Sequence, residues 1–119
     1  MNVADVEPNV HGGRRRRNLG RAAGSRWTGI QHVECDVGTL SVVPHVHSME
    51  EEIYVVLSGS ARIKLDEEIV ALGQWDAIRV AATTARAIEA GSEGAEILAF
   101  GAPSNDNADA QVLPDFWRD

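Results

Sequence analysis

Residues 44–59 read PHVHSMEEEIYVVLSG, and this stretch decides how the rest of the chain is interpreted. It holds two of the protein's four histidines, His45 and His47, and its run of three glutamates ends at Glu52. The alternating and β-branched residues on both sides predict two strands joined by a polar turn. Side chains two positions apart on a strand point the same way, so both imidazoles lie on one face, about 6.5–7 Å apart at the backbone.

The two histidines and the glutamate together could bind one metal ion. Two imidazoles on one face can bind the same ion at about 2.1 Å each. Glu52 opens the next strand, from which its carboxylate can reach back to that ion. Tyr54 shares the face of Glu52, and its hydroxyl could enter the same pocket or simply pack in the core. An isolated pair of histidines is a weak signal, but an inward-facing glutamate needs a partner, which favours the metal interpretation.

The rest of the chain shows the same kind of short, strand-like segments. Each is rich in Val, Ile or Leu, and each break between them holds Gly, Asp, Ser or Thr. Strands at this close spacing predict an all-β sandwich or barrel. The expected strands cover residues 29–35, 40–47, 52–57, 60–66, 69–72, 76–81, 86–90 and 95–101.

The length of 119 residues is that of one domain. We expect residues 1–25 to form a basic, partly flexible arm, residues 26–102 to form the barrel, and residues 103–119 to form a C-terminal tail. The arm and the body differ in charge. Residues 1–30 carry six arginines and two acids, a net charge of +4, whereas residues 31–119 carry five basic and sixteen acidic residues, a net charge of −11.

The acidic body argues against nucleic acid as a partner. The four consecutive arginines at 14–17 could be a nucleic-acid patch, but no aromatic residues interleave them as a stacking surface would need. We interpret them as a basic arm lying against an acidic body, either its own or that of a neighbour.

The single cysteine, Cys35, excludes an intrachain disulfide and is typical of a reducing compartment. No apolar run approaches the roughly 18 residues of a membrane span, and the N-terminal residues lack the apolar segment of a secretory signal. We therefore expect a cytoplasmic protein with no membrane partner.

The spacing of the histidines resembles a known family motif. His45 and His47 are followed by four residues and Glu52, and then by six residues and Gly59. This resembles the first motif of the cupin superfamily. The resemblance covers about residues 25–101 and implies an all-β double-stranded β-helix, a jelly-roll barrel.

The second cupin motif is degraded. Its opening glycine is matched by Gly73, but Arg86 stands where the third histidine of the family is expected and Ala90 where an asparagine is expected. In the family, two histidines, a glutamate and the third histidine hold one divalent metal ion. That ion supports dioxygenases, decarboxylases, isomerases, lyases and cyclases.

The resemblance therefore implies a metal site at His45, His47 and Glu52, with Zn, Fe, Mn or Ni as the ion. It implies an enzyme acting on a small organic molecule inside the barrel. The residues themselves add Tyr54, which shares the face of Glu52, and the cation Arg86 as candidate catalytic residues. Arg86 suggests that the substrate is anionic. An N-terminal arm that adds to a neighbouring subunit is common in the family, so we expect a homodimer.

Arg86 leaves three interpretations open, because an arginine has no lone pair to offer a metal. In the first, the metal binds and Arg86 holds a carboxylate or phosphate of the substrate at the rim. In the second, no metal binds and Arg86 pairs with Glu52 in place of the cation, which leaves a ligand-binding or regulatory module or an acid–base isomerase or cyclase. In the third, a shift of one residue turns Arg86 outward. His32 could substitute as a fourth ligand, but it is more simply a partly exposed strand residue.

Overall fold

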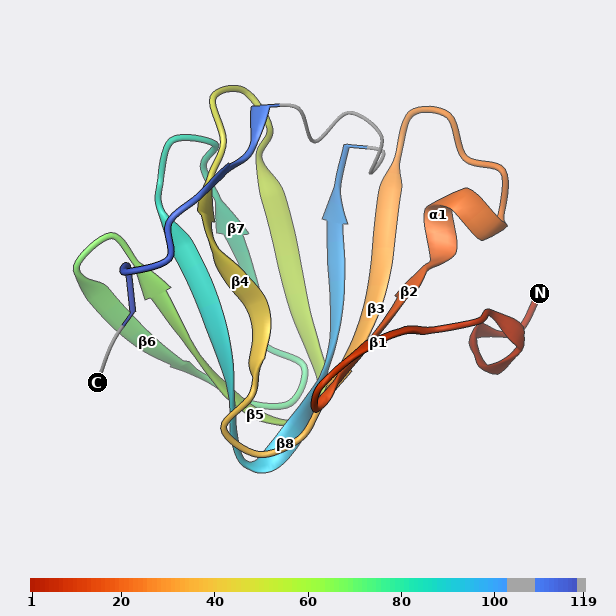
Figure 1. The fold of residues 1–119 in the computed structure, drawn as a ribbon, viewed down its shortest axis with the longest axis horizontal. Coiled ribbons are helices and arrows are strands. Elements are labelled where there is room, and N and C mark those ends of the chain that lie inside the picture. Colours follow the sequence, from red (N-terminus) through yellow and green to blue (C-terminus); the bar gives the residue numbers. More distant parts are fainter. Residues whose placement is uncertain (103–108, 118–119) are drawn as a thin grey trace.

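Nine antiparallel strands pair in one sheet that curls on itself in the computed structural model, which describes residues 1–102 and 109–117 (Figure 1). Two short helical turns accompany the strands near the N-terminus. The elements, in chain order, are η1 (Val3–Asp5), β1 (Asn9–His11), β2 (Arg14–Asn18), α1 (Leu19–Ala22), β3 (Gly29–Cys35), β4 (Leu40–Val46), β5 (Glu52–Leu65), β6 (Glu68–Leu72), β7 (Ala77–Val80), β8 (Arg86–Gly101) and β9 (Gln111–Val112).

The two long strands β5 and β8 run side by side through the whole sheet and join its two halves. In one half the order is β1, β2, β3, β8, β5 and β7. In the other half the order is β9, β4, β8, β5 and β6. This arrangement confirms the predicted all-β jelly roll.

A bulge lets the paired strands β5 and β8 bend from one half to the other. The register between them shifts on either side of Gly59, whose φ is +76°. A Cβ at this position would lie 2.2 Å from the carbonyl oxygen of Gly94. Only glycine fits both the left-handed backbone and this close approach. The motif glycine of the sequence is therefore a requirement of the bend.

The core lies between the two halves, where alternate side chains of each strand point inward. Several of its largest members are completely or almost completely buried, so the inner faces pack as in other protein interiors. The core residues are Val33, Cys35, Tyr54, Val56, Ala61, Ile63, Leu72, Val80, Ile88, Ala90, Ala95 and Ile97.

The N-terminal segment extends the sheet. Strand β2 pairs with β3 along its whole length, and β1 pairs with β2. Arg17 on β2 forms an ion pair with Glu34 on β3 at 2.6 Å, as an arm lying on an acidic body would. The division of the chain into arm, barrel and tail stays a prediction, although β1 and β2 carry the sheet beyond the barrel boundary that we expected.

The C-terminal tail also lies on the barrel where it is described. Strand β9 pairs with the end of β4, and Lys64 of β5 donates a hydrogen bond to the Phe116 carbonyl at 2.6 Å. Residues 103–108 and 118–119 of the expected tail lie outside the described residues. Among the described helices, none is long and apolar enough to cross a membrane.

Candidate metal centre

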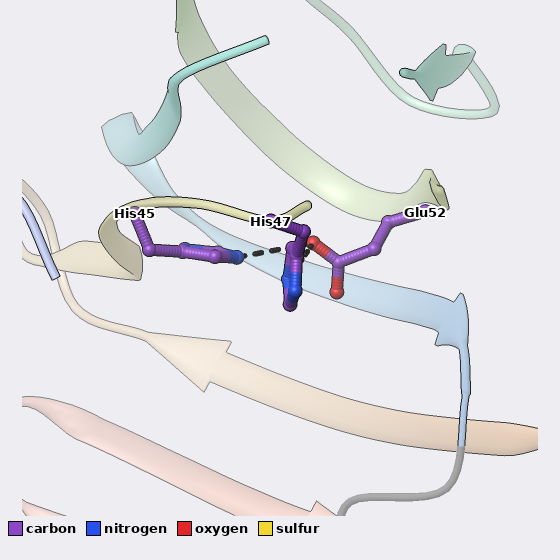
Figure 2. A group of neighbouring side chains, drawn as sticks. All are labelled: His45, His47 and Glu52. Carbon is purple, nitrogen blue, oxygen red and sulfur yellow. Dashed lines mark hydrogen bonds and ion pairs between the residues drawn. The ribbon is translucent and has the colours of Figure 1, made fainter. Parts of the chain in front are cut away.

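The two histidines and Glu52 come together where β4 ends and β5 begins (Figure 2). His45 is the second-to-last residue of β4, His47 follows the strand, and Glu52 is the first residue of β5. One ligand atom from each of the three lies within 4.8 Å of the others. The imidazole rings are nearly perpendicular, with centroids 4.8 Å apart. This cluster could hold a metal ion.

The orientation of His45 is set by a backbone carbonyl. Its Nδ1 lies 2.7 Å from the carbonyl oxygen of Val43. A carbonyl oxygen only accepts hydrogen bonds, so Nδ1 carries the proton. In the neutral ring, Nε2 then presents its lone pair, and it lies 3.1 Å from Oε1 of Glu52.

His47 is oriented by Asp109, a residue from the tail. Its Nδ1 donates to Oδ1 of Asp109 at 2.9 Å, and Oδ2 of the same carboxylate accepts from the backbone N–H groups of Met49 and Glu50 at 3.0 and 3.1 Å. The hydrogen bond from His47, followed by those from the backbone, holds the pKa of Asp109 well below its usual range. A carboxylate that accepts from Nδ1–H is the usual support of a metal-binding histidine.

The Nε2 atom of His47 has no hydrogen-bond partner among the described residues and is buried. Two carboxylate oxygens lie close to it: Oε2 of Glu50 at 3.3 Å and Oε1 of Glu52 at 3.4 Å. With both Nδ1 atoms protonated, the neutral histidines place their Nε2 lone pairs against carboxylate oxygens, which are also acceptors. Such an arrangement needs a cation or additional protons, and the donor set fits a divalent ion.

Glu52 stays ionised at the centre of the cluster. Burial opposes its ionisation. A hydrogen bond from His45 when its ring also carries a proton at Nε2, a hydrogen bond from Tyr54 and the charge of Arg86 outweigh burial and keep the pKa below its usual range. The Tyr54 hydroxyl donates to Oε1 of Glu52 at 2.5 Å. Burial and the neighbouring carboxylate raise the pKa of Tyr54 well above its ordinary value, so the phenol keeps its proton. The contact positions Glu52, and a catalytic role for Tyr54 stays a prediction.

Arg86 is fully buried beside the cluster. Its guanidinium donates to the carbonyl oxygens of Val80, Ala81 and Ala82 at 3.4, 2.9 and 3.3 Å. Its Nε lies 3.7 Å from Oε1 of Glu52. The outward-facing interpretation is therefore wrong.

Arg86 is also not among the residues that line the cavity, so it does not lie at the rim where the first interpretation placed it. Its two terminal nitrogens donate to the end of β7 and the loop that follows, and its Nε has no hydrogen-bond partner among the described residues. Its pairing with Glu52 matches the contact of the second interpretation.

His32 is not part of the cluster. Its Nε2 lies 2.6 Å from Glu96, and the side chain is buried instead of partly exposed.

The cluster opens into a cavity of about 200 Å³ inside the curled sheet. Polar groups stand on two of its walls. His45, His47, Glu50 and Glu52 lie on one, and Arg14 and Arg16 of β2 contribute to another. The remaining lining is mostly small or apolar and comes from Gly29, Gln31, Val33, Ser41, Val42, Val43, Tyr54, Ala99, Gly101, Ala102, Ala110 and Val112.

Sequence reasoning missed several polar residues of this site. Glu50 falls in the polar turn predicted between the two strands, where a solvated side chain is expected, yet its side chain is 8 % exposed and lines the cavity. Burial, followed by the charges of Glu52 and Asp109, raises its pKa despite the opposing effects of His47 and the Ala102 N–H. Asp109 is far away in sequence, and no local pattern marks it. For Arg14 and Arg16 the one available signal was that, in a strand, every second residue of the four consecutive arginines would point to the same face.

Comparison with known proteins places the chain in a family. The family model for the Cupin domain matches residues 31–101, more than half of the sequence. The chain belongs to the cupin family. The resemblance drawn from the first motif is therefore confirmed. No curated protein matches the chain in sequence.

Solved cupin structures share this fold. KdgF from Halomonas sp. superimposes with a TM-score of 0.76 at 21 % identity, over 90 % of this chain and 94 % of that one. Pac13 from Streptomyces, described as a nucleoside dehydratase, has a TM-score of 0.75 at 20 % identity, over 94 % of this chain and 88 % of that one. A putative sugar phosphate isomerase from Acidithiobacillus ferrooxidans has a TM-score of 0.72 at 28 % identity, over 82 % of this chain and 67 % of that one.

Proposed function

We propose that this cupin is a metal-dependent enzyme that acts on a small anionic organic molecule inside the barrel. The observation that carries the proposal is the convergence of His45, His47 and Glu52. Both Nδ1–H groups are engaged outside the cluster, so both Nε2 lone pairs and the carboxylate face one another. Zn, Fe, Mn and Ni all suit this ligand set.

The chemistry we propose is proton transfer, as in an isomerase or a lyase. A divalent ion bound at the cluster would act as a Lewis acid on a substrate oxygen. Glu50 lines the cavity beside the cluster and can hold or release a proton at Oε2, while its Oε1 accepts from the Ala102 N–H at 3.1 Å. The solved cupins named as a sugar phosphate isomerase and a nucleoside dehydratase support small polar substrates of this kind.

Metal content tests the proposal directly. We expect plasma mass spectrometry of untagged protein to find about one metal ion per chain, and we expect His47→Ala to lose it. Turnover of sugar phosphates or sugar acids by the loaded protein should stop on chelation and return with one particular metal. No metal, even after zinc or iron is added back, would contradict the proposal.

The contact between Arg86 and Glu52 favours a second candidate, in which no metal binds. Arg86 then supplies the positive charge beside Glu52. Such a protein would be a ligand-binding or regulatory module, or an isomerase or cyclase that uses His45 or His47 as its base. Turnover that survives chelation would indicate the acid–base catalyst, and tight ligand binding without turnover would indicate the module.

The homodimer and the cytoplasmic location also remain predictions. Strands β1 and β2 pair within their own sheet, so a dimer would not need to exchange them. Light scattering on the purified protein would measure the mass and test the dimer.

A further inference from the structure

Strand β2 divides its four arginines between two environments. Because side chains alternate along a strand, Arg14 and Arg16 face the cavity and the other two face away from it. Arg15 and Arg17 meet acids on the outer side: Arg17 pairs with Glu34 at 2.6 Å, and Arg15 lies 3.4 Å from Asp36. The outer pair is thus neutralised by the protein itself.

The inner pair is not neutralised in this way. The side chains of Arg14 and Arg16 form no hydrogen bond or ion pair with any residue that the structure describes. Arg14 is half-buried, and burial together with the like charge of Arg16 lowers its pKa. Two cations close together, one of them half-buried, are unfavourable unless an anion joins them.

A neighbouring side chain adds an unpaired polar atom to the same cavity. Oε1 of Gln31, on β3 beside β2, is buried and has no hydrogen-bond partner among the described residues. Buried amide oxygens are rarely left without a donor. A ligand hydroxyl in the cavity would supply one. The remaining lining next to it is largely apolar, with Val33 and Ala99 among its members.

We infer that Arg14 and Arg16 form an oxyanion-binding subsite that holds the carboxylate or phosphate group of a hydroxylated substrate, with Gln31 accepting from a substrate hydroxyl. The inference rests on the proposed function, because the substrate's reacting end must then reach the cluster of His45, His47 and Glu52. It also moves the anion-binding role to strand β2 from Arg86, which does not line the cavity and whose terminal nitrogens donate to backbone carbonyls. Guanidinium groups suit this role because they bind carboxylates and phosphates in a bidentate manner.

Inorganic phosphate and acetate can probe the subsite in two separate titrations. The protein is first freed of metal and dialysed, so that neither anion can bind to an ion at the cluster. Nitrogen-15 NMR then follows the Nε–Hε signals of the arginines at constant ionic strength. The variants Arg14→Gln and Arg16→Gln assign these signals and remove the proposed contacts. Arg15→Gln is the matched control, because it removes the same charge from the outer face of the same strand.

We expect at least one of the two anions to shift the Arg14 and Arg16 signals saturably. Binding should weaken about tenfold or more in Arg14→Gln and in Arg16→Gln and stay within about twofold of the wild type in Arg15→Gln. The anion that binds more tightly indicates whether the substrate group is a phosphate or a carboxylate. Arg16 is exposed, so its replacement keeps the test informative even if Arg14→Gln fails to fold.

Shifts that do not saturate, that spread over all arginines, or that are the same in all three variants would overturn the inference. Metal content measured on separate, metal-loaded portions of the same proteins keeps the two proposals apart. If the loaded portions bind metal but replacing Arg14 or Arg16 does not change anion binding, the subsite alone is refuted. If the anion binds at these arginines but the loaded portions take up no metal, the metal site is refuted and the subsite stands.

Discussion

The chemistry of the site depends on which nitrogen of each histidine carries the proton. For His45 the Val43 carbonyl decides this, and for His47 the carboxylate of Asp109 decides it. The arrangement leaves both Nε2 atoms directed at Glu52. A protein that only packed two histidines in its core would not need this common orientation.

Asp109 should act as a positioning residue for His47. In Asp109→Asn the side chain keeps one acceptor oxygen, so it cannot serve both the His47 ring and the two backbone N–H groups that the carboxylate now binds. We expect zinc affinity to fall about 10- to 100-fold. Competition with a chromophoric chelator measures this.

Glu67→Gln is the control for the Asp109 variant, because it removes the same charge from an exposed turn. Its zinc affinity should equal that of the wild type. Equal affinity in Asp109→Asn would show that the tail contact does not orient the ligand.

At the scale of the elements, the sequence patterns located most strands but did not predict that some of them run on without a break. The strand expected at residues 29–35 is observed as Gly29–Cys35, because a glycine and an aspartate bound a run of alternating residues. Breaks were expected at residues 58–59 and 91–94. The structure instead shows the uninterrupted strands β5 and β8. Glycine within a strand can mark a bulge as well as an end, and local sequence does not distinguish the two.

The bulge at Gly59 should be sensitive to a single methyl group. In Gly59→Ala the Cβ meets the Gly94 carbonyl at 2.2 Å and the backbone must keep a φ of +76°. We expect a loss of more than about 3 kcal/mol in the free energy of unfolding, since the clash adds to a dihedral cost of about 1–2 kcal/mol. Urea denaturation measures the loss.

Gly24→Ala is the matched control for this prediction. Gly24 has a φ of +79°, but a Cβ there meets nothing within 4 Å. It should show the dihedral cost alone, about 1–2 kcal/mol. Equal losses in the two variants would mean that the bend tolerates the added atom.

At the scale of the whole molecule, folding brings the basic N-terminal segment against acidic residues of the barrel. The basic N-terminal residues lie on the acidic body through β2 and β3. The contact between Arg17 and Glu34 is the shortest ion pair of the described β2 arginines, and the hydrogen bond from Arg17 lowers the pKa of Glu34.

This contact should make stability depend on pH. Because the folded-state pKa of Glu34 lies below the ordinary value of about 4.3, its stabilisation is complete above that value and is lost as the pH falls through the folded-state pKa. Glu34→Gln should therefore be less stable than the wild type at pH 7 by about 0.2–1 kcal/mol, as for a partly exposed pair. The difference should be smaller at about pH 3, below that ordinary value.

Urea denaturation at the two pH values tests this, with Glu67→Gln as the control for a general loss of charge. A difference between Glu34→Gln and the wild type that is the same at both pH values would show that charge at Glu34 is not its cause.

The sequence by itself determined the strand-rich fold and the cluster of His45, His47 and Glu52. Both follow from local rules, because alternation and a two-residue spacing set which side chains share a face. Only the tertiary structure decided what surrounds the cluster. Asp109 reaches His47 from 62 positions away, Arg86 turns its guanidinium to the backbone, and β2 brings Arg14 and Arg16 to the cavity. Such contacts depend on how distant strands pair, and no local spacing in the sequence records that pairing.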